Sequence, residues 1–350
     1  FFYNANKRGI TLNLENSDGR EIFKKLVKKA DFVIESFDPG YLDELGLGYQ
    51  KLSRINPHLI MISVSPFGQQ GPHHDYKAND LICTARSGLM YITGDSARAP
   101  LRVSAEQAYA QAGAQAAAAG MVAHWHRLMS GEGQHVDISI RESVAIATTG
   151  VAMQSFWNFA GHIIPRRGSK TARGNINVEL LYPCKGGYVC WRVIVGPMGG
   201  QTSALVEWLD SEGIAGELNE VNWIEEDMLK IAPERWSHWE ELFSKFFLTK
   251  TKTELFQEAV KREIWLFPVN SPKDVFENVQ LSARGFWLSV NHPELGETIT
   301  YPGIPIKSSE FLLGIKRRAP LIGEHNREIY EEELGLTKEE LLLLKQGGVI

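Results

Sequence analysis

Histidine and cysteine side chains could bind a metal or act as nucleophiles, and their spacing indicates which use a chain can make of them. His124 and His126 are two residues apart in a helical pattern, so their side chains point to different sides of the helix. The segment 73–75, His-His-Asp, has a composition typical of a solvated turn. The sequence contains no His-Glu-x-x-His and no paired Cys-x-x-Cys. We therefore expect no metal site.

Glycine-centred motifs leave the chemistry open. The sequence has no Gly-x-x-x-x-Gly-Lys-Ser/Thr loop to hold phosphates and no Gly-x-Ser-x-Gly elbow to expose a serine nucleophile. Gly131 and Gly133 lack the third glycine of a dinucleotide fingerprint and precede a strand pattern instead of a helix. P-loop nucleotidases are thereby excluded, and α/β-hydrolases are disfavoured.

Length and charge limit the classes that remain. A chain of 350 residues predicts about two domains at roughly 150 residues each, and its 43% apolar content excludes disordered and fibrous classes. With 37 basic and 42 acidic side chains the net charge is −5, so we expect no nucleic-acid partner. Three cysteines are too few for a disulfide framework, which favours reduced thiols in a cytoplasmic protein. Cys184 and Cys190 flank a predicted Gly-Gly turn, where they could face each other.

Two features concern membranes and the chain start. The run 143–164 carries no Asp, Glu, Lys or Arg, but polar residues and glycines interrupt it, so we expect a buried helix and no membrane span. The sequence opens on Phe1 without a Met, and we expect that it begins inside a longer natural chain.

Residues 9–65 alternate between strand and helix patterns. Residues 10–14 alternate with period two as a strand or extended segment, and residues 31–34 and 59–64 are short apolar strands. This β-α-β-α-β order predicts a parallel sheet with crossover helices. Ligands of such sheets gather at the carboxyl ends of the strands, which here are residues 35–37 and 65–68.

The rest of the chain predicts one long helix and a second domain. Residues 104–129 are rich in alanine, and Gly113 and Gly120 would let another backbone approach, so we expect a central core helix. A strand follows at 135–140. The basic loop 166–174 is typical of a boundary or a mobile segment. From about residue 182 the pattern becomes that of a smaller α+β domain, with helices near 199–211, 236–248 and 252–263.

Five segments, 4–14, 30–40, 63–72, 127–137 and 319–326, together resemble the family III CoA-transferases, which include the α-methylacyl-CoA racemases. They stand in the family's order over nearly the whole sequence. The resemblance implies an α/β fold with a Rossmann-like large domain built from both chain ends, and a smaller α+β domain. We place these at 1–165 with 305–350, and at 180–304. It also implies an interlocked dimer, and that several tens of N-terminal residues of the family are missing from this sequence.

The resemblance also implies a chemistry. In the family, an Asp on the long helix attacks an acyl-CoA to form a mixed anhydride, which the CoA thiolate converts into an enzyme thioester. That Asp stands four residues before a helix glycine and eighteen before the arginine of an Arg-x-x-x-Gly turn. Counting from Gly113 and from Arg127, both rules give Tyr109. A phenol cannot form this anhydride, so we expect the chain to lack the catalytic Asp.

Two other routes to catalysis involve residues near the position of the missing Asp. Glu106 lies three residues earlier, one turn back on the predicted helix, although a carboxylate after Ser104 would also favour the helix N-terminus. The racemase branch needs an acid–base pair around the α-carbon, and its histidine falls at Asn79, which cannot carry a proton. Asp80 alone is half of that mechanism, so racemisation is disfavoured.

Further positions are assigned to coenzyme A by the same resemblance. Leu12, Leu14 and Phe37 match the adenine and pantetheine region, and Lys77 matches a lysine near the cofactor. Against this, Glu15 and Glu44 stand where some members carry cations, and would repel a CoA phosphate. The basic loop 166–174 matches the family's mobile glycine-rich loop in position. An acyl pocket could include residues 156, 157 and 159, Phe-Trp-Phe, although we expect them in the core.

The resemblance therefore implies a subunit of a heteromeric CoA-transferase whose homologous partner chain keeps the Asp. It would help to move CoA from an acyl-CoA such as succinyl-CoA to a carboxylic acid, for which an aromatic succinate of aromatic degradation is a candidate. The CoA thioester would be a substrate, with no permanently bound cofactor. Two alternatives stay open: a self-sufficient CoA-transferase that uses Glu106, and a CoA-ester-binding protein without catalysis.

Overall fold

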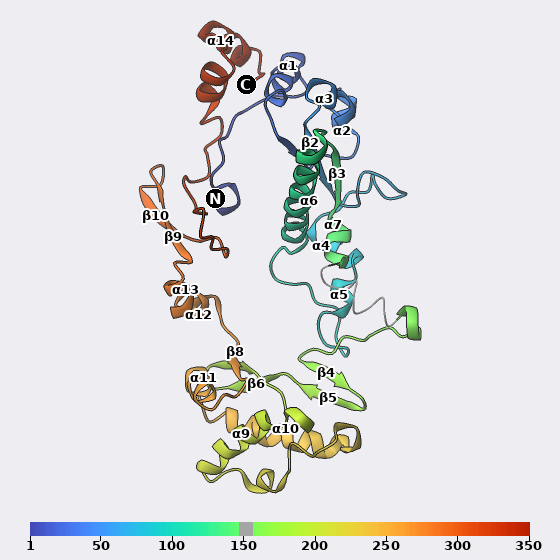
Figure 1. Ribbon diagram of the computed structural model, residues 1–350, viewed down its shortest axis with the longest axis vertical. Coiled ribbons are helices and arrows are strands. Elements are labelled where there is room, and N and C mark those ends of the chain that lie inside the picture. Colours follow the sequence, from blue (N-terminus) through green and yellow to red (C-terminus); the bar gives the residue numbers. More distant parts are fainter. Residues whose placement is uncertain (147–156) are drawn as a thin grey trace. The chain divides into compact units, whose positions relative to one another are not determined.

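The computed structural model describes residues 1–146 and 157–350, which divide into two compact units (Figure 1). The first unit is Phe1–Tyr91, Arg102–Ile164 and Val279–Ile350, so it contains both ends of the chain; the second is Ile92–Leu101 and Pro165–Asn278. The helix predicted over 143–164 falls largely on residues outside the described ranges. Within those ranges, no helix has both the length and the apolar character needed to cross a bilayer.

A parallel sheet forms the centre of the first unit, as predicted. Strands β1 (Phe32–Glu35), β2 (Ile60–Ser65) and β3 (His135–Ser139) lie in the order β1-β2-β3, with Ile34 beside Ile62 and Ile62 beside Val136. Helix α1 (Ser17–Val27) precedes β1, and α2 (Tyr41–Glu44) and α3 (Tyr49–Ile55) connect β1 to β2. Residues 10–13 belong to no helix or strand, and residue 14 lies in a turn, so the strand expected at 10–14 does not form.

Helices cover the two faces of this sheet because β2 is apolar on both sides. Ile60 and Ile62 pack against Ala116 and Ala123 of α6 (Ala108–Ser130). The side chain between them, Met61, points the other way into a cluster with residues of α1 to α3. This alternation with period two is what a strand buried on both faces requires.

Helix α6 lies close to β2 because Gly120 faces it. A Cβ atom at Gly120 would come within 2.8 Å of the Ile62 Cδ1, whereas nothing lies within 4 Å of Gly113. Within this chain, the expected close approach of a neighbouring segment is therefore found at Gly120 and not at Gly113. The prediction that this helix lies in the core is correct for one side only. That side packs on the sheet, whereas the other side is exposed at Met121, Val122, Trp125, Leu128 and Met129.

Arg127 fixes the C-terminal end of α6 to the sheet. Its guanidinium donates to the Asp31 and His58 carbonyl oxygens at 3.1 and 2.9 Å, and to the Asp31 carboxylate at 2.9 Å. Gly131 then ends the helix with a φ of 78°. A Cβ atom at Gly133 would overlap the Leu59 carbonyl oxygen. The Arg-x-x-x-Gly-x-Gly segment is thus explained by main-chain packing.

Both chain ends meet in the first unit. The Tyr330 hydroxyl donates to the Thr11 carbonyl oxygen at 2.6 Å, and the Asn13 amide donates to the Val349 carbonyl oxygen at 2.8 Å. The remaining elements of this unit are η1 (Phe2–Asn4), α4 (Asp80–Arg86), α5 (Leu89–Ile92), α7 (Ile140–Val144), α13 (Val279–Ala283), β9 (Trp287–His292), β10 (Glu297–Pro302), the π-helical η6 (Glu328–Glu333) and α14 (Lys338–Gln346).

The predicted small domain, 180–304, differs from the second unit at both boundaries. Residues 279–304 group with the first unit, where Glu294 accepts hydrogen bonds from His292 at 2.9 Å and from Arg318 at 2.8 Å. Residues 92–101 group with the second unit, where the Gly94 carbonyl oxygen accepts from the Gly168 amide at 2.8 Å. Contacts between residues distant in the sequence set these boundaries.

The second unit packs antiparallel strands against helices around an aromatic core. Its buried rings include Trp191, Trp208, Trp223, Trp236, Trp239 and Phe243. Its elements are β4 (Lys170–Arg173), β5 (Ile176–Glu179), β6 (Leu181–Cys184), β7 (Gly187–Cys190), η3 (Gly196–Met198), α9 (Gly200–Ser211), η4 (Gly216–Glu220), η5 (Met228–Lys230), α10 (Pro233–Phe247), α11 (Lys252–Lys261), β8 (Phe267–Pro268) and α12 (Pro272–Phe276). The segment 166–174, expected to be a boundary or mobile, begins just after the change of unit between Ile164 and Pro165. It contains β4, whose backbone pairs with β5.

The three cysteines are free thiols. Cys184 stands opposite Gly187 and Cys190 opposite Leu181, so the two do not face each other across the turn. The two-residue turn puts them out of register. Burial, with a smaller effect of the Asp80 carboxylate, raises the pKa of the Cys83 thiol to about 11, so this thiol stays protonated at neutral pH.

We predict that Gly133→Ala destabilises the protein by about 1–3 kcal/mol, because the new methyl group overlaps main chain that cannot move aside freely. Gly113→Ala is the matched control. It adds the same methyl group where nothing lies within 4 Å, and should stabilise α6 by roughly 0.5–1 kcal/mol. Urea-unfolding midpoints measure both variants. Equal midpoints would contradict the packing at Gly133.

Candidate functional site

A cavity of about 290 Å³ lies where the loops after β1 and β2 meet. Pro39 and Gly40 follow β1, and Gln69 and Gln70 follow β2, so the wall is built at the sheet edge where a parallel sheet binds its ligands. The remaining lining residues are Asp43, His74, His135 and Asp137. The predicted location of a ligand site at these strand ends thus coincides with a cavity.

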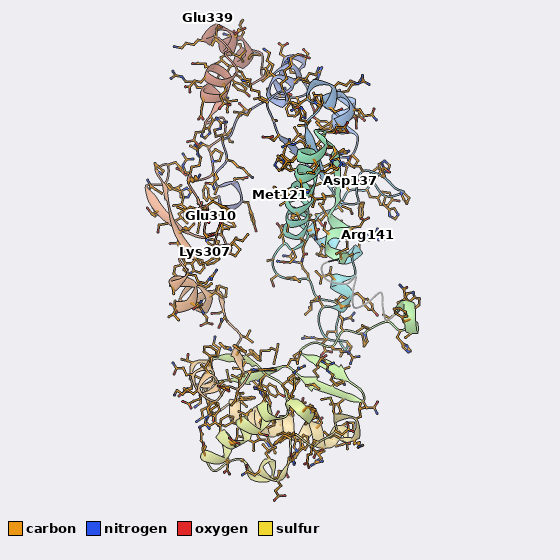
Figure 2. All side chains as sticks on the ribbon, in the orientation of Figure 1. Met121, Asp137, Arg141, Lys307, Glu310 and Glu339 are labelled. Carbon is orange, nitrogen blue, oxygen red and sulfur yellow. The ribbon has the colours of Figure 1, made fainter. Side chains whose placement is uncertain are left out.

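Asp137 holds the loop after β2 in place. Its carboxylate accepts a hydrogen bond from the Gln69 amide at 2.9 Å, and Gly68 before it has a φ of 86°. The Arg141 amide donates to the Pro66 carbonyl oxygen at 3.1 Å and holds the start of the same loop. Figure 2 labels Asp137 and Arg141 on β3 and α7. Three segments that carried the resemblance, 30–40, 63–72 and 127–137, therefore meet at this cavity.

Phe37 and Lys77 lie near each other beside this wall. Lys77 pairs with Asp38, the residue between Phe37 and the cavity-lining Pro39. The Phe37 ring is 45% exposed and lies 5.0 Å from the Tyr41 ring, centroid to centroid. Both side chains are therefore accessible to a ligand, and their contact with CoA stays a prediction.

Leu12 and Leu14, the other two residues assigned to coenzyme A, belong to two different hydrophobic clusters. Leu12 packs against Ile329, Tyr330 and Val349 near the chain end. Leu14 packs in the separate cluster that includes Val27 and Leu42. Both leucines are half-buried, so each has a structural role whether or not it touches CoA. The acidic Glu15 and Glu44 are exposed.

Tyr109 and Asp80 join α4 to α6 by two hydrogen bonds. The Tyr109 hydroxyl accepts from the Asp80 amide at 3.1 Å, and the Asp80 carboxylate accepts from the Ala108 amide at 2.7 Å. Asn79 caps α4 by accepting from the Ile82 amide at 3.1 Å. The three side chains that the resemblance placed near the chemistry all hold helix termini. The hydrogen bond between Asp80 and the start of α6 could not be found from the sequence, since no local pattern links residue 80 to residue 108.

Glu106 lies outside α6, which corrects the expected helix start. The helix begins at Ala108 because Asp80, brought in by the fold, accepts its first amide hydrogen. Glu106 is therefore not one helical turn before Tyr109. It is exposed in the segment that precedes the helix.

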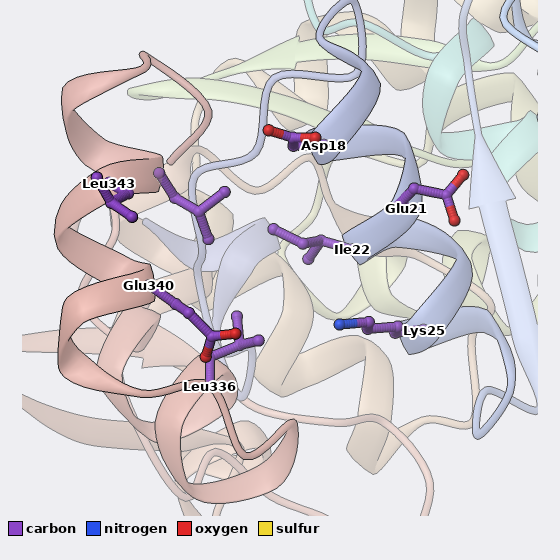
Figure 3. Close-up of a pocket in the computed structure, with 8 residues that line it drawn as sticks. Asp18, Glu21, Ile22, Lys25, Leu336, Glu340 and Leu343 are labelled. Carbon is purple, nitrogen blue, oxygen red and sulfur yellow. The ribbon is translucent and has the colours of Figure 1, made fainter.

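The expected core aromatics are also at the surface. Trp157 is 58% exposed and Phe159 is 91% exposed, while Phe156 lies outside the described residues. Within the described ranges, no group of three or more His, Cys, Asp or Glu side chains could hold a metal ion. A separate cavity of about 340 Å³ between α1 and α14 has an apolar floor and charged side chains at its edge (Figure 3).

The fold is that of an α/β protein with a cavity at the edge of its parallel sheet. The model of CoA-transferase family III matches residues 1–326. The chain belongs to CoA-transferase family III.

Several known proteins are similar over almost the whole chain. The succinyl-CoA:(R)-benzylsuccinate CoA-transferase subunit BbsE of Thauera aromatica is 36% identical over 99% of this chain and 83% of its own. A formyl-CoA:oxalate CoA-transferase of Streptomyces avermitilis is 31% identical over 99% of this chain and 85% of its own. A crystal structure of a CAIB/BAIF family protein from Brucella suis matches with a TM-score of 0.80 at 26% identity, covering 94% of this chain and 82% of that one.

We predict that Tyr109→Phe speeds amide hydrogen exchange at residues 80–84 by roughly 2- to 10-fold, because the Asp80 amide loses its acceptor at a cost of about 0.5–1.5 kcal/mol. Tyr188→Phe is the control, since its hydroxyl makes no hydrogen bond within the described structure. Exchange measured by mass spectrometry on peptides that span α4 and the start of α6 reports the change. Unaltered exchange in Tyr109→Phe would argue against the linkage.

Proposed function

We propose that this chain is the subunit of a heteromeric CoA-transferase that does not carry the catalytic Asp. A homologous partner chain supplies that residue, and the complex moves CoA from an acyl-CoA to a carboxylic acid. One observation carries the proposal. Tyr109 occupies the position that the resemblance assigns to the Asp, and its hydroxyl accepts a hydrogen bond from the Asp80 amide.

The chemistry at Tyr109 supports this division of roles. Transfer through an anhydride and an enzyme thioester needs a carboxyl group, because only an acyl carbon on the enzyme can take up the CoA thiolate. A phenol has no such carbon. Asp80 is committed to the Ala108 amide at 2.7 Å and closes the junction of α4 and α6. Tyr109 and Asp80 are accordingly assigned a structural role.

The substrates are proposed from the relatives. The relative at 36% identity is named as a subunit of an enzyme that uses succinyl-CoA and (R)-benzylsuccinate. We extend this pair to the present chain, with succinyl-CoA as donor and an aromatic succinate as acceptor, in aromatic degradation. Other relatives are named for oxalate or D-citramalate, so the choice of an aromatic acid depends on this one similarity.

The exposed face of α6 supports an interlocked assembly with the partner. Met121, Val122, Trp125, Leu128 and Met129 are 60–77% exposed on one helix. Figure 2 labels Met121 on this helix. An apolar surface of this kind marks a protein interface, and the open space above Gly113 would let another backbone approach. We propose that a homologous chain covers this surface. The surface belongs to the part of this chain that we propose to be the large Rossmann-like domain.

Phe37 and Lys77, with Leu12 and Leu14, are the proposed contacts to the CoA thioester, which is a substrate and not a resident cofactor. The cytoplasmic location also stays a proposal. It rests on three free cysteines, of which Cys83 and Cys184 are buried.

Trapping the covalent intermediate tests the division of roles. The complex is incubated with succinyl-CoA, and borohydride then reduces the enzyme thioester to an alcohol with release of CoA. Both chains are digested, and mass spectrometry locates the carboxyl side chain that has become an alcohol. We expect the modified residue on the partner chain and none on this one. A control variant, Glu106→Gln, should keep full activity.

Modification of Glu106 or Tyr109, or turnover by a homodimer of this chain alone, would overturn the proposal. A complex that binds the CoA ester without transferring it would favour the CoA-ester-binding alternative.

We also predict that Trp125→Glu weakens association with the partner chain at least tenfold, because it places a charge in the apolar face of α6. Ile224→Glu, in the second unit and 55% exposed, is the matched control. Native mass spectrometry of the co-purified complex measures the loss. An intact complex with Trp125→Glu would exclude this face from the interface.

A further inference from the structure

A third cavity, of about 180 Å³, lies within the second unit. The hairpin of β4 and β5 forms one wall, with Thr171 and Arg173, and the segment that follows β7 forms another, with Arg192 and Val193. Met198 and Met228 complete the apolar lining. The only charged side chains in the lining are the two arginines, although the whole chain has a net charge of −5.

The acidic side chains next to this lining are already paired with other cations. Glu179 pairs with Lys170 at 3.8 Å. Glu226 pairs with Arg235 at 2.9 Å, and Asp227 pairs with Lys230 at 3.1 Å. Within the described residues, neither Arg173 nor Arg192 has an ion pair or a side-chain hydrogen bond. The lining of this cavity therefore contains two positive charges and no carboxylate.

Arg192 is half-buried, and this makes its missing partner informative. A charge withdrawn from water is costly unless an opposite charge or hydrogen-bond acceptors replace the lost hydration. Exposed arginines are hydrated and need no partner, so Arg173 alone would indicate nothing. The Arg192 side chain lines a largely apolar cavity and has no charged partner within the described residues, so an anion from outside the chain can take that place.

We propose that this cavity binds the carboxylate of a small organic acid, with Arg192 as its main partner and Arg173 as a second cation. A guanidinium matches a carboxylate in two parallel hydrogen bonds, and the apolar wall suits a hydrocarbon body. The volume is below the range of roughly 300–1,000 Å³ typical of sites for drug-sized ligands, so a short acid fits and a whole coenzyme does not.

In a CoA-transferase such an acid is the acceptor or the acyl part of the donor. This identification rests on the proposed function. Binding of a carboxylate at Arg192 does not, since it follows from the cavity and its charges alone.

Methyl NMR of the full chain tests the site directly. With ¹³C-methyl methionine, the probes are succinate, benzylsuccinate, uncharged succinamide and inorganic phosphate. We expect saturable shifts of the Met198 and Met228 methyl signals with the two acids, and none at Met121 or Met129 on α6. Succinamide should have no effect. Phosphate acting as well as succinate would replace the carboxylate assignment with a general anion site.

Charge variants identify the partner. Arg192→Gln should weaken acid binding about 10- to 100-fold, as expected for the loss of a charged hydrogen bond, and Arg192→Lys should restore part of it. Arg173→Gln, at an exposed position, should fold normally and show a smaller loss. Lys245→Gln, 64% exposed on α10, is the control and should bind like the native chain.

Absence of any acid binding by the native chain, or unchanged affinity in both Arg192→Gln and Arg173→Gln, would overturn the inference. If the acid binds through the arginines but the complex transfers no CoA, the carboxylate site stands and the proposed function is wrong. If the complex transfers CoA but no acid binds at the arginines, the proposed function stands and the carboxylate site is wrong.

Discussion

The attachment of α6 at both of its ends is the constraint on which the first unit depends. Arg127 binds two main-chain carbonyl oxygens beside the sheet at one end, and Asp80 accepts the Ala108 amide at the other. Gly120 sets how close the helix lies to β2 between these points. Because helix interiors satisfy their own hydrogen bonds while helix ends do not, partners at the ends decide where the helix starts and stops.

This constraint also gives Tyr109 its meaning. A side chain at the second residue of α6 can face the end of α4, and the phenol uses that position for a hydrogen bond to the Asp80 amide. In the proposed assembly, the reacting carboxyl belongs to another chain, and this one contributes surface and binding groups. The exposed face of α6 is the surface that we propose for the partner chain, and the arginine-lined cavity is the binding site that we propose for an acid.

Local patterns in the sequence were sufficient for much of the fold. Short apolar runs located β1 and β2, an alternating run located β3, and helical periodicity located α9, α10 and α11. Such signals involve residues a few positions apart, which interact in any chain that adopts the element. Membership of CoA-transferase family III likewise followed from the order of five short segments.

The sequence by itself determined the parallel strands, the family and the identity of the residue at position 109. Tertiary structure decided what these residues touch. It placed Leu12 and Leu14 in different clusters, took Glu106 off the helix, exposed Trp157, and brought Arg173 and Arg192 to one cavity. The physical reason is that hydrogen bonds and burial between distant residues depend on distances that packing sets, and no local periodicity records them.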